Sequence, residues 1–491
     1  MSVVRRQGIK NTVYTYLGII LGILSSLYIQ PFFLSQEQIG ITRLFISVAT
    51  ILASVSCLGI TSVIVKFFPL FHNKEKKHNN FFTIALVFPI IGFGLCFSLV
   101  CFFGDYILQF YGKNADILLL YFRPIMLSSL FICLVFSFTA YCNSIDKSSL
   151  PTLINEVVNR LGFILCIILF WAGLTTQNTY IYTLSFIYLI QLLLLFMIIN
   201  HSGHPRFSLS FFADNANLKS IVSFGLISAF IQITGISIKF IDIVFVGKYE
   251  TLSQVGVYSI AAFIGLVLET PLNALEKIAG AKISRLFAAD NTVEIEKIYK
   301  LSSKYLMAFC GFFGCVLVVC IQPILSLLPG DYSSGTMVTI IICIGAFINS
   351  ATGVNYSIIT YSNFFKLSAL LYFLLLILTI VLNLILIPIY GITGAAIATA
   401  LVSVAHNLLR FVLIKNKLNM QPFTTESFKI ILIVVTSVLS ACWLQVENTF
   451  LLIFLRGLVS AGVFAILIVA LKVFTLKEIK QEIQGFKSTF I

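Results

Sequence analysis

The chain alternates from one end to the other between long apolar stretches and short polar gaps. Each stretch has about twenty residues, the length of helix that crosses the roughly 30 Å hydrocarbon core of a bilayer. Lipid offers no partner to backbone N–H and C=O groups, so such stretches must be helical. The pattern predicts an all-α integral membrane protein with fourteen transmembrane helices. The predicted spans are Val13–Leu34, Ile41–Val65, Phe81–Phe103, Ile117–Cys142, Leu150–Leu174, Tyr180–Ile199, Leu218–Val246, Val255–Leu275, Tyr305–Leu328, Val338–Ile359, Leu367–Ile387, Ile392–Ile414, Phe428–Leu444 and Phe450–Phe474.

Lysine and arginine are concentrated in every second gap between these spans. Basic residues precede the first span and follow each even-numbered one, whereas the opposite gaps hold only Lys113 and Lys248. Cytoplasmic loops carry the excess of basic residues in membrane proteins. Both termini are therefore predicted to be cytoplasmic, and the number of spans is even.

Composition agrees with a membrane location and argues against other classes. The chain is 59% hydrophobic and 10% charged, whereas a soluble domain has about 25% charged residues. The net charge of +13 is spread over many short loops, so it indicates contact with anionic lipid headgroups and not with nucleic acid. All eleven cysteines lie in or beside apolar spans without a CxxC pair, which indicates packing, and we expect no metal and no cofactor.

The gaps leave little room for a domain outside the membrane. Every outward gap is short, whereas a polytopic glycan polymerase or ligase needs catalytic residues in a sizeable outward loop. We therefore expect that the protein is not an enzyme. The largest inward gap, Glu276–Lys304, mixes apolar and charged residues, and this predicts one or two amphipathic helices on the inner surface.

The two halves of the chain resemble each other. Gln38–Ile41 at the start of the second span matches Gln254–Val257 at the start of the eighth, and Tyr141–Asn143 after the fourth matches Tyr361–Asn363 after the tenth. Six is even, so two six-helix repeats enter the membrane from the same side, the parallel arrangement of many secondary transporters. We predict two six-helix bundles, residues 1–205 and 206–418, followed by two further helices and a cytoplasmic tail in residues 419–491.

Several segments resemble the polysaccharide-flippase branch of the multidrug/oligosaccharidyl-lipid/polysaccharide exporter superfamily. They are Pro31–Gly40, Asp242–Gly247, Gln254–Tyr258 and Ile387–Thr399 with the sequence IPIYGITGAAIAT. The resemblance extends over essentially the whole chain and implies two bundles with two trailing helices. It also implies transport of undecaprenyl-diphosphate-linked oligosaccharide from the inner to the outer leaflet of the bacterial cytoplasmic membrane, beside the glycosyltransferases and polymerase of surface polysaccharide synthesis.

Charges within spans are the candidates for a site, because an ionised group there costs about 2.5–3.5 kcal/mol on insertion scales. Glu156 and Arg160 are four residues apart in the fifth span and can pair, and Asn155 and Asn159 repeat that spacing. Arg160 lies too deep to reach the headgroups, and a guanidinium matches a phosphate with two parallel hydrogen bonds. Two interpretations stay open for Arg160: a ligand for a lipid diphosphate, or a structural partner of Glu156.

The remaining intramembrane charges are weaker candidates. Lys239 and Asp242 can pair in the seventh span, and Glu269 precedes Pro271 in the eighth. Arg43, Arg123 and Arg456 lie close to the outer ends of their helices, where long side chains can extend to the headgroups. In the first span, Gly18 and Gly22 form a GxxxG pattern that indicates close helix packing.

Two transport functions fit these features, and flipping of a peptidoglycan precursor stays open because the same cavity chemistry would serve it. The first is a flippase for lipid-linked oligosaccharide that works by alternating access, biased by an ion gradient or by the membrane potential. The second is a cation-coupled multidrug exporter of the same superfamily, which would need buried carboxylates in the N-terminal bundle. The first span has none, and Glu156 has Arg160 beside it.

Overall fold

The computed structural model describes residues 3–71, 81–203, 207, 218–362 and 364–474. These residues form helices and connecting turns without a strand, as predicted. The basic gap with Lys74, Lys76 and Lys77 lies outside the described residues, as do Arg206 and the tail with Lys477, Lys480 and Lys487. The chain divides into two compact units: residues 1–260 with 383–392, and residues 261–382 with 393–491. These units are groups of packed residues, and the predicted repeat boundaries stay a prediction.

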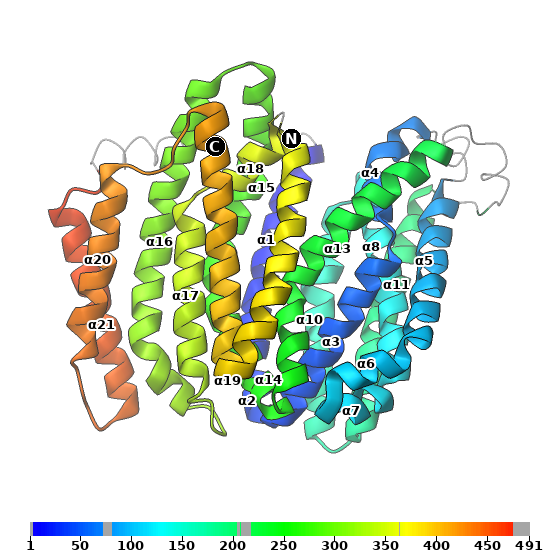
Figure 1. Ribbon diagram of the computed structural model, residues 1–491, viewed down its shortest axis with the longest axis horizontal. Coiled ribbons are helices and arrows are strands. Elements are labelled where there is room, and N and C mark those ends of the chain that lie inside the picture. Colours follow the sequence, from blue (N-terminus) through cyan, green and yellow to red (C-terminus); the bar gives the residue numbers. More distant parts are fainter. Residues whose placement is uncertain (1–2, 72–80, 204–206, 208–217, 363, 475–491) are drawn as a thin grey trace. The chain divides into compact units, whose positions relative to one another are not determined.

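The first unit contains the N-terminal helices (Figure 1, blue to green). They are α1 (Val3–Ile23), η1 (Leu24–Ile29), α2 (Gln30–Phe33), α3 (Gln36–Ser56), α4 (Ile60–Phe71), α5 (Phe82–Phe102), α6 (Gly104–Tyr111), η3 (Gly112–Asn114), α7 (Ala115–Leu120), α8 (Phe122–Ser144), α9 (Ser149–Leu153), η4 (Ile154–Val158), α10 (Asn159–Trp171), α11 (Gln177–Gly203), α13 (Leu218–Tyr249) and the start of α14 (Leu252–Leu266). The segments η1 and η4 are π-helical and continue the neighbouring α-helices.

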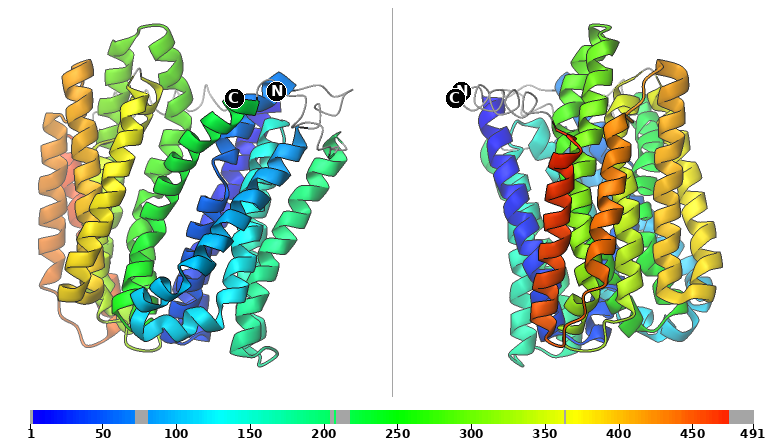
Figure 2. Two further views of the ribbon diagram at one scale, coloured as in Figure 1. Left: turned by 45° about the vertical axis from the view of Figure 1, so that its right-hand side comes forward. Right: turned by 90° about the vertical axis from the view of Figure 1, so that its left-hand side faces the viewer.

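The second unit contains most of the C-terminal part of the chain. Its helices are η5 (Val267–Glu269), α15 (Thr270–Ala288), α16 (Thr292–Ser326), α17 (Gly335–Ala351), α18 (Asn355–Tyr361), most of α19 (Phe365–Leu418), α20 (Thr425–Cys442) and α21 (Thr449–Ala470). The last two, orange and red, form a hairpin (Figure 2). They are the two extra helices predicted from the sequence.

Twelve described helices are long and apolar enough to cross a membrane, or thirteen if the bent pair α17 and α18 forms one span. Large apolar side chains such as Ile20, Leu193 and Ile466 are exposed, as expected for surfaces solvated by lipid. The chain is therefore a multi-pass membrane protein. The predicted number of fourteen stays a prediction, although α19 alone covers two of the predicted spans.

The 54-residue helix α19 turns back on itself near its middle. A straight helix of that length would measure about 80 Å, far more than a bilayer is thick. Gly391 has φ +58° and ψ −139°, and Figure 1 shows two arms that meet at this point. Glycine suits this left-handed backbone because it has no Cβ. The turn falls between the predicted spans Leu367–Ile387 and Ile392–Ile414.

Local sequence explains where several helices begin. At α3, Ser35 Oγ accepts from the backbone N–H of Gln38, and the Gln38 side chain accepts from the backbone N–H of Ser35. This reciprocal capping satisfies two donors that a helix start leaves without partners. Asn291 caps α16 in the simpler way, accepting from the N–H of Glu294.

The second and eighth predicted spans are both broken. The second is α3 and α4 with Leu58 and Gly59 at positive φ between them, and the eighth is α14 and α15 with the 3-10 turn Val267–Glu269 between them. The two interruptions differ in kind: the second span has a turn with residues at positive φ, whereas the eighth continues through a 3-10 segment with right-handed helical residues on both sides.

The predicted amphipathic helices between Glu276 and Lys304 do not form separate elements. Helix α15 continues to Ala288 and α16 begins at Thr292, so only a short turn separates them. Lys282 and Glu294 approach within 3.7 Å across this hairpin. The segment therefore forms extensions of two long helices, with Ile283 and Ile295 buried inside the second unit and Ile278 72% exposed.

Small residues allow close backbone contact within the first unit. A Cβ on Gly40 of α3 would lie 1.8 Å from the carbonyl oxygen of Leu252, and one on Gly256 would lie 2.1 Å from that of Gln36. The segments that matched between the two halves of the sequence, Gln38–Ile41 and Gln254–Val257, therefore also pack against each other.

We predict that Gly40→Val destabilises the protein by at least about 1–3 kcal/mol, the usual cost of overpacking. The neighbouring atom is a backbone carbonyl that cannot change rotamer. The melting temperature of the purified protein in detergent would report the loss. Gly94→Val is the control, because a Cβ on Gly94 in α5 would meet nothing within 4 Å. Equal melting temperatures for the two variants would contradict the prediction.

Candidate functional site

The fifth predicted span contains an ion pair. Arg160 at the start of α10 donates through Nη2 to Oε2 of Glu156 in η4 at 3.1 Å, as the spacing predicts. About a third of each side chain is exposed, 32% and 34%. The pair is therefore reachable from outside the packed helices. A π-helical turn such as η4 is rare and often marks a functional site.

The two glycines of the GxxxG pattern in α1 make room for this pair. The carbonyl oxygen of Gly18 accepts from Nη1 of Arg160. A Cβ on Gly22 would lie 1.8 Å from that same nitrogen, and one on Gly18 would lie 2.8 Å from Cβ of Glu156. The close packing predicted from these glycines brings the backbone of α1 against the guanidinium of Arg160.

A second guanidinium reaches the same region from α3. Arg43 donates through Nη2 to Oγ of Ser26 at 3.0 Å and to Oε1 of Gln30 at 2.9 Å. Its Nε is buried, with no hydrogen-bond partner among the described residues. Arg43 therefore does not extend to the headgroups. Arg43 and Arg160 are close enough to repel each other.

We call Arg43, Arg160 and Glu156, with Ser26 and Gln30, the two-arginine site. Two guanidiniums and one carboxylate leave a net positive charge of one. In a medium of low dielectric constant a net charge attracts a counter-ion strongly. A guanidinium offers several N–H donors in one plane, an arrangement that matches the oxygens of phosphates and carboxylates. The two-arginine site can therefore hold an anion.

Asn155 and Asn159, the asparagine pair predicted in the fifth span, have different surroundings. Asn155 donates to Oγ1 of Thr139 at 3.2 Å and accepts from Gln191 at 2.6 Å, which ties η4 to α8 and α11. Asn159 is half-buried, and its Oδ1 has no hydrogen-bond partner in the described part of the chain. Of the two, Asn155 is a structural residue, whereas Asn159 has a buried acceptor without a partner among the described residues.

Asp242 belongs to a buried polar cluster elsewhere in the first unit. It is 7% exposed and accepts from the Tyr258 hydroxyl at 3.3 Å and from Nδ2 of Asn383 at 2.9 Å. Lys239, its predicted partner, has an exposed side chain. The structure thus joins Asp242 to residues of α14 and α19 that are distant in sequence.

The second unit contains a chain of hydrogen bonds that begins at Glu269. Asn349 donates to Glu269 at 3.0 Å, Asn407 donates to Asn349 at 3.0 Å, and Asn355 donates to Asn407 at 2.9 Å. Arg410 continues it by donating to Oδ1 of Asn355 at 3.4 Å. This series of hydrogen bonds includes Asn349 of α17 and Asn355 of α18, on the two sides of the break between these helices. The two helices are bent by 51° relative to each other.

Sequence reasoning missed Arg410. The guanidinium is 6% exposed, donates to the Tyr372 hydroxyl at 3.0 Å and lies over the ring of Tyr356. Arg410 lies within the predicted span Ile392–Ile414, yet its charge is easily counted with the basic residues of the following inner gap. Its position four residues inside that span is the signal that could have revealed it.

Two other arginines at outer helix ends differ from Arg43. Arg123 at the start of α8 is exposed, in agreement with the interpretation that it extends to the headgroups. Arg456 of α21 donates to the backbone carbonyls of Leu444 and Val319 at 3.0–3.2 Å. Its bonds to backbone atoms make Arg456 a structural residue that holds α21 in the second unit.

The fold resembles that of solved flippases and transporters. The lipid II flippase MurJ, in an inward closed conformation, superposes with a TM-score of 0.76 at 16% identity, over 94% of this chain and 99% of MurJ. An inward-facing multidrug resistance transporter of the MATE family and MOP superfamily gives 0.61 at 13% identity, over 85% and 98%. A mutant of the Vibrio cholerae MATE transporter VcmN gives 0.55 at 13% identity, also over 85% and 98%.

At these identities the structural likeness shows the fold alone. The structures named above are flippases and transporters, in agreement with the expectation that the chain is not an enzyme. No curated protein sequence matches the chain. The profile of a family described as polysaccharide biosynthesis protein matches residues 5–275, more than half of the sequence. The chain therefore belongs to the polysaccharide biosynthesis protein family.

Proposed function

We propose that the protein is a flippase that moves undecaprenyl-diphosphate-linked oligosaccharide from the inner to the outer leaflet of the bacterial cytoplasmic membrane, with both termini in the cytoplasm. The observation that carries the proposal is the two-arginine site, a net positive, partly exposed group of side chains within membrane-spanning helices. A diphosphate that crosses hydrocarbon needs such a partner, because an unpaired charge there is costly.

The chemistry of the site suits a diphosphate better than a neutral or cationic drug. Arg160 keeps donors beyond its bonds to Glu156 and Gly18, and Nε of Arg43 has no partner among the described residues. An arriving phosphate would accept from both guanidiniums and relieve their mutual repulsion. Such charge-assisted hydrogen bonds are roughly twice as strong as neutral ones.

Transport by this route requires alternating access of a polar cavity to the two sides of the membrane. The isoprenoid chain would stay in the bilayer beside α20 and α21, whose exposed residues Phe454, Leu458 and Ile466 are apolar. The membrane potential or an ion gradient would supply the bias, since one charge moved through 100 mV is worth about 2.3 kcal/mol. Glycosyltransferases and a glycan polymerase would act before and after this step.

A cation-coupled drug exporter is the alternative, supported by the fold shared with multidrug transporters and by the buried carboxylate of Asp242. The ion pair of Glu156 with Arg160 weighs against the exporter. Glu156 is the carboxylate of the two-arginine site, and Arg160 already neutralises its charge.

Transport of a purified substrate distinguishes these functions. We expect the full chain in liposomes to move a polyprenyl-diphosphate oligosaccharide between leaflets, as measured by the access of added periodate, which oxidises the sugar diols, or of a lectin to the oligosaccharide. Cells that lack the protein should accumulate lipid-linked oligosaccharide and lose surface glycan. Normal surface glycan without such accumulation, together with efflux of cationic dyes, would instead support the exporter.

Substitution of Arg160 separates its two interpretations. Arg160→Gln should reduce the transport rate at least about tenfold, because it removes a charged hydrogen bond worth about 1.5–3 kcal/mol. It also leaves Glu156 unpaired, which is destabilising in itself. The double variant Glu156→Gln/Arg160→Gln removes that unpaired charge.

If Arg160 binds the cargo, the double variant folds and stays inactive; if it only pairs with Glu156, the double variant regains transport. Arg43→Gln should also lose about tenfold, because it removes the second cation. Arg285→Gln is the matched control, since that side chain is exposed on the hairpin between α15 and α16. Rates are compared per molecule of folded protein in the liposomes.

Gly22→Val tests the geometry without removing either charge. A side chain at this position would displace Nη1 of Arg160, which lies 1.8 Å from the added Cβ. We expect most of the transport to be lost, although both arginines remain. Gly8→Val in the same helix is the control, because a Cβ there meets nothing within 4 Å. Full transport by Gly22→Val at normal protein levels would contradict a requirement for this position of Arg160.

A further inference from the structure

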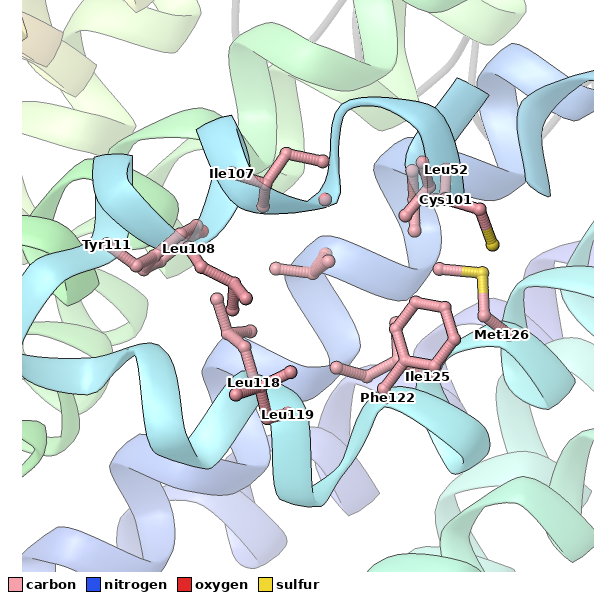
Figure 3. A pocket seen from close by; sticks show the side chains of 13 residues that line it. Leu52, Cys101, Ile107, Leu108, Tyr111, Leu118, Leu119, Phe122, Ile125 and Met126 are labelled. Atoms are coloured by element: carbon pink, nitrogen blue, oxygen red, sulfur yellow. The ribbon is translucent and has the colours of Figure 1, made fainter. Parts of the chain in front are cut away.

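The first unit contains an apolar cavity of about 300 Å³, and none of its lining residues belongs to the two-arginine site. The short helices α6 and α7 fold over the ends of α5 and α8 and close it on one side. In Figure 3, Leu108, Leu118 and Phe122 gather around one open space, with Leu52 near Cys101 and Ile125 next to Phe122. Except for the thiol of Cys101, all these side chains are hydrocarbon.

An apolar cavity of this size is an unfavourable place for water and an unfavourable space to leave empty. Water enters a cavity only where it finds two or more polar partners. A void without occupant atoms loses dispersion contacts along its whole lining. An apolar cavity of half this volume, about 150 Å³, is known to stay dry and to take up small hydrocarbons. A hydrocarbon group is therefore the most favourable occupant of this cavity.

The opening of the cavity is continuous with the lipid-facing surface. Cys101 and Leu119 line the cavity and are also exposed, so it opens between the end of α5 and α7. The residues next to them in sequence, Phe102 and Leu120, are 80% and 57% exposed. A ligand that enters across such a surface arrives from the bilayer and not from water.

The helices over the cavity have the character of the membrane interface. Asp105 and Gln109 of α6 and Asp116 of α7 are exposed, whereas Leu108 and Leu118 turn inward to the cavity. Short helices with one polar and one apolar face lie at the boundary of headgroups and chains. Arg123, exposed at the start of α8 directly after the lining residue Phe122, supplies a cation at that boundary.

We infer that this cavity is a binding site for one acyl chain of a membrane phospholipid, whose phosphate lies near Arg123. The apolar lining takes the chain, and the exposed guanidinium complements the phosphate. Phospholipid surrounds the protein in great excess, so even a site of modest affinity is filled by mass action. The occupied site stabilises the fold of α6 and α7 over α5 and α8, and it is independent of the cargo and of the proposed flippase activity.

Photo-labelling in a defined bilayer tests the inference. The full chain is placed in nanodiscs of phosphatidylethanolamine and phosphatidylglycerol that contain a phospholipid with a diazirine midway along one acyl chain. Mass spectrometry of the labelled peptides then locates the chain. We expect labelling of the segments around Val100–Leu108 and Leu118–Met126 several-fold above that of the lipid-facing residues Ile190 and Leu193 of α11.

Filling the cavity should exclude the chain. Val48→Phe adds a ring to a half-buried lining residue and is expected to lower labelling of these segments at least fivefold; Val100→Phe serves if Val48→Phe does not fold. Val469→Phe is the matched control, because Val469 is 74% exposed on α21. Arg123→Gln should lower labelling by an anionic probe about twofold and leave a zwitterionic probe unchanged. Gel filtration confirms that each variant is folded.

Three results would overturn the inference. The first is labelling of the cavity segments no stronger than that of α11. The second is undiminished labelling in a folded Val48→Phe protein. The third is labelling by a polyprenyl-phosphate diazirine in place of the phospholipid, which would assign the cavity to an isoprenoid chain. None of these measurements depends on transport, so they are separate from the tests of the flippase.

Discussion

Hydrocarbon provides no hydrogen-bond partner, and this single constraint determines most of the structure. It forces the backbone into helices, and it favours a partner inside the protein for each charged side chain within a span. Three intramembrane arginines show the result. Arg160 donates both to a backbone carbonyl and to the carboxylate of Glu156. Arg456 donates to backbone carbonyls, and Arg43 donates to Ser26 and Gln30. Each bond fixes one helix against another, so the groups suited to a ligand are also those that hold the helices in place.

The sequence predicts well whatever depends on neighbours along one helix. The apolar stretches correspond to the observed helices, and the spacing of Glu156 and Arg160 correctly predicts their ion pair. The close packing expected of Gly18 and Gly22 is also observed. These features follow from helical periodicity, which is the same in every protein.

Contacts between distant helices could not be predicted in the same way. Nothing in the sequence near Arg43 indicates that its guanidinium feels the charge of Arg160, because this depends on how α1, α3 and α10 pack. The contact of Asp242 with Asn383 has the same origin.

Arg410 was missed for another reason: counting charge by loop assigns a basic residue near a helix end to the loop, although this side chain is buried. The amphipathic segment after Glu276 was misjudged in the opposite direction. Its residues Ile283 and Ile295 were expected at the membrane surface, but they are buried by other parts of the protein.

The π-helical segment η4 has a consequence for relating this chain to others. A π turn holds one more residue than an α turn of the same height, and each residue of an α-helix advances the side-chain direction by about 100°. A homologous helix with one residue fewer between Ile154 and Val158 would stay the same length in space but lack this irregularity. An alignment that places the missing residue outside this turn would then put the residue facing α1 one position away from Arg160. Comparison of cargo preference across relatives therefore requires superposition of this helix in three dimensions, since equivalent guanidiniums can occupy different columns of an alignment.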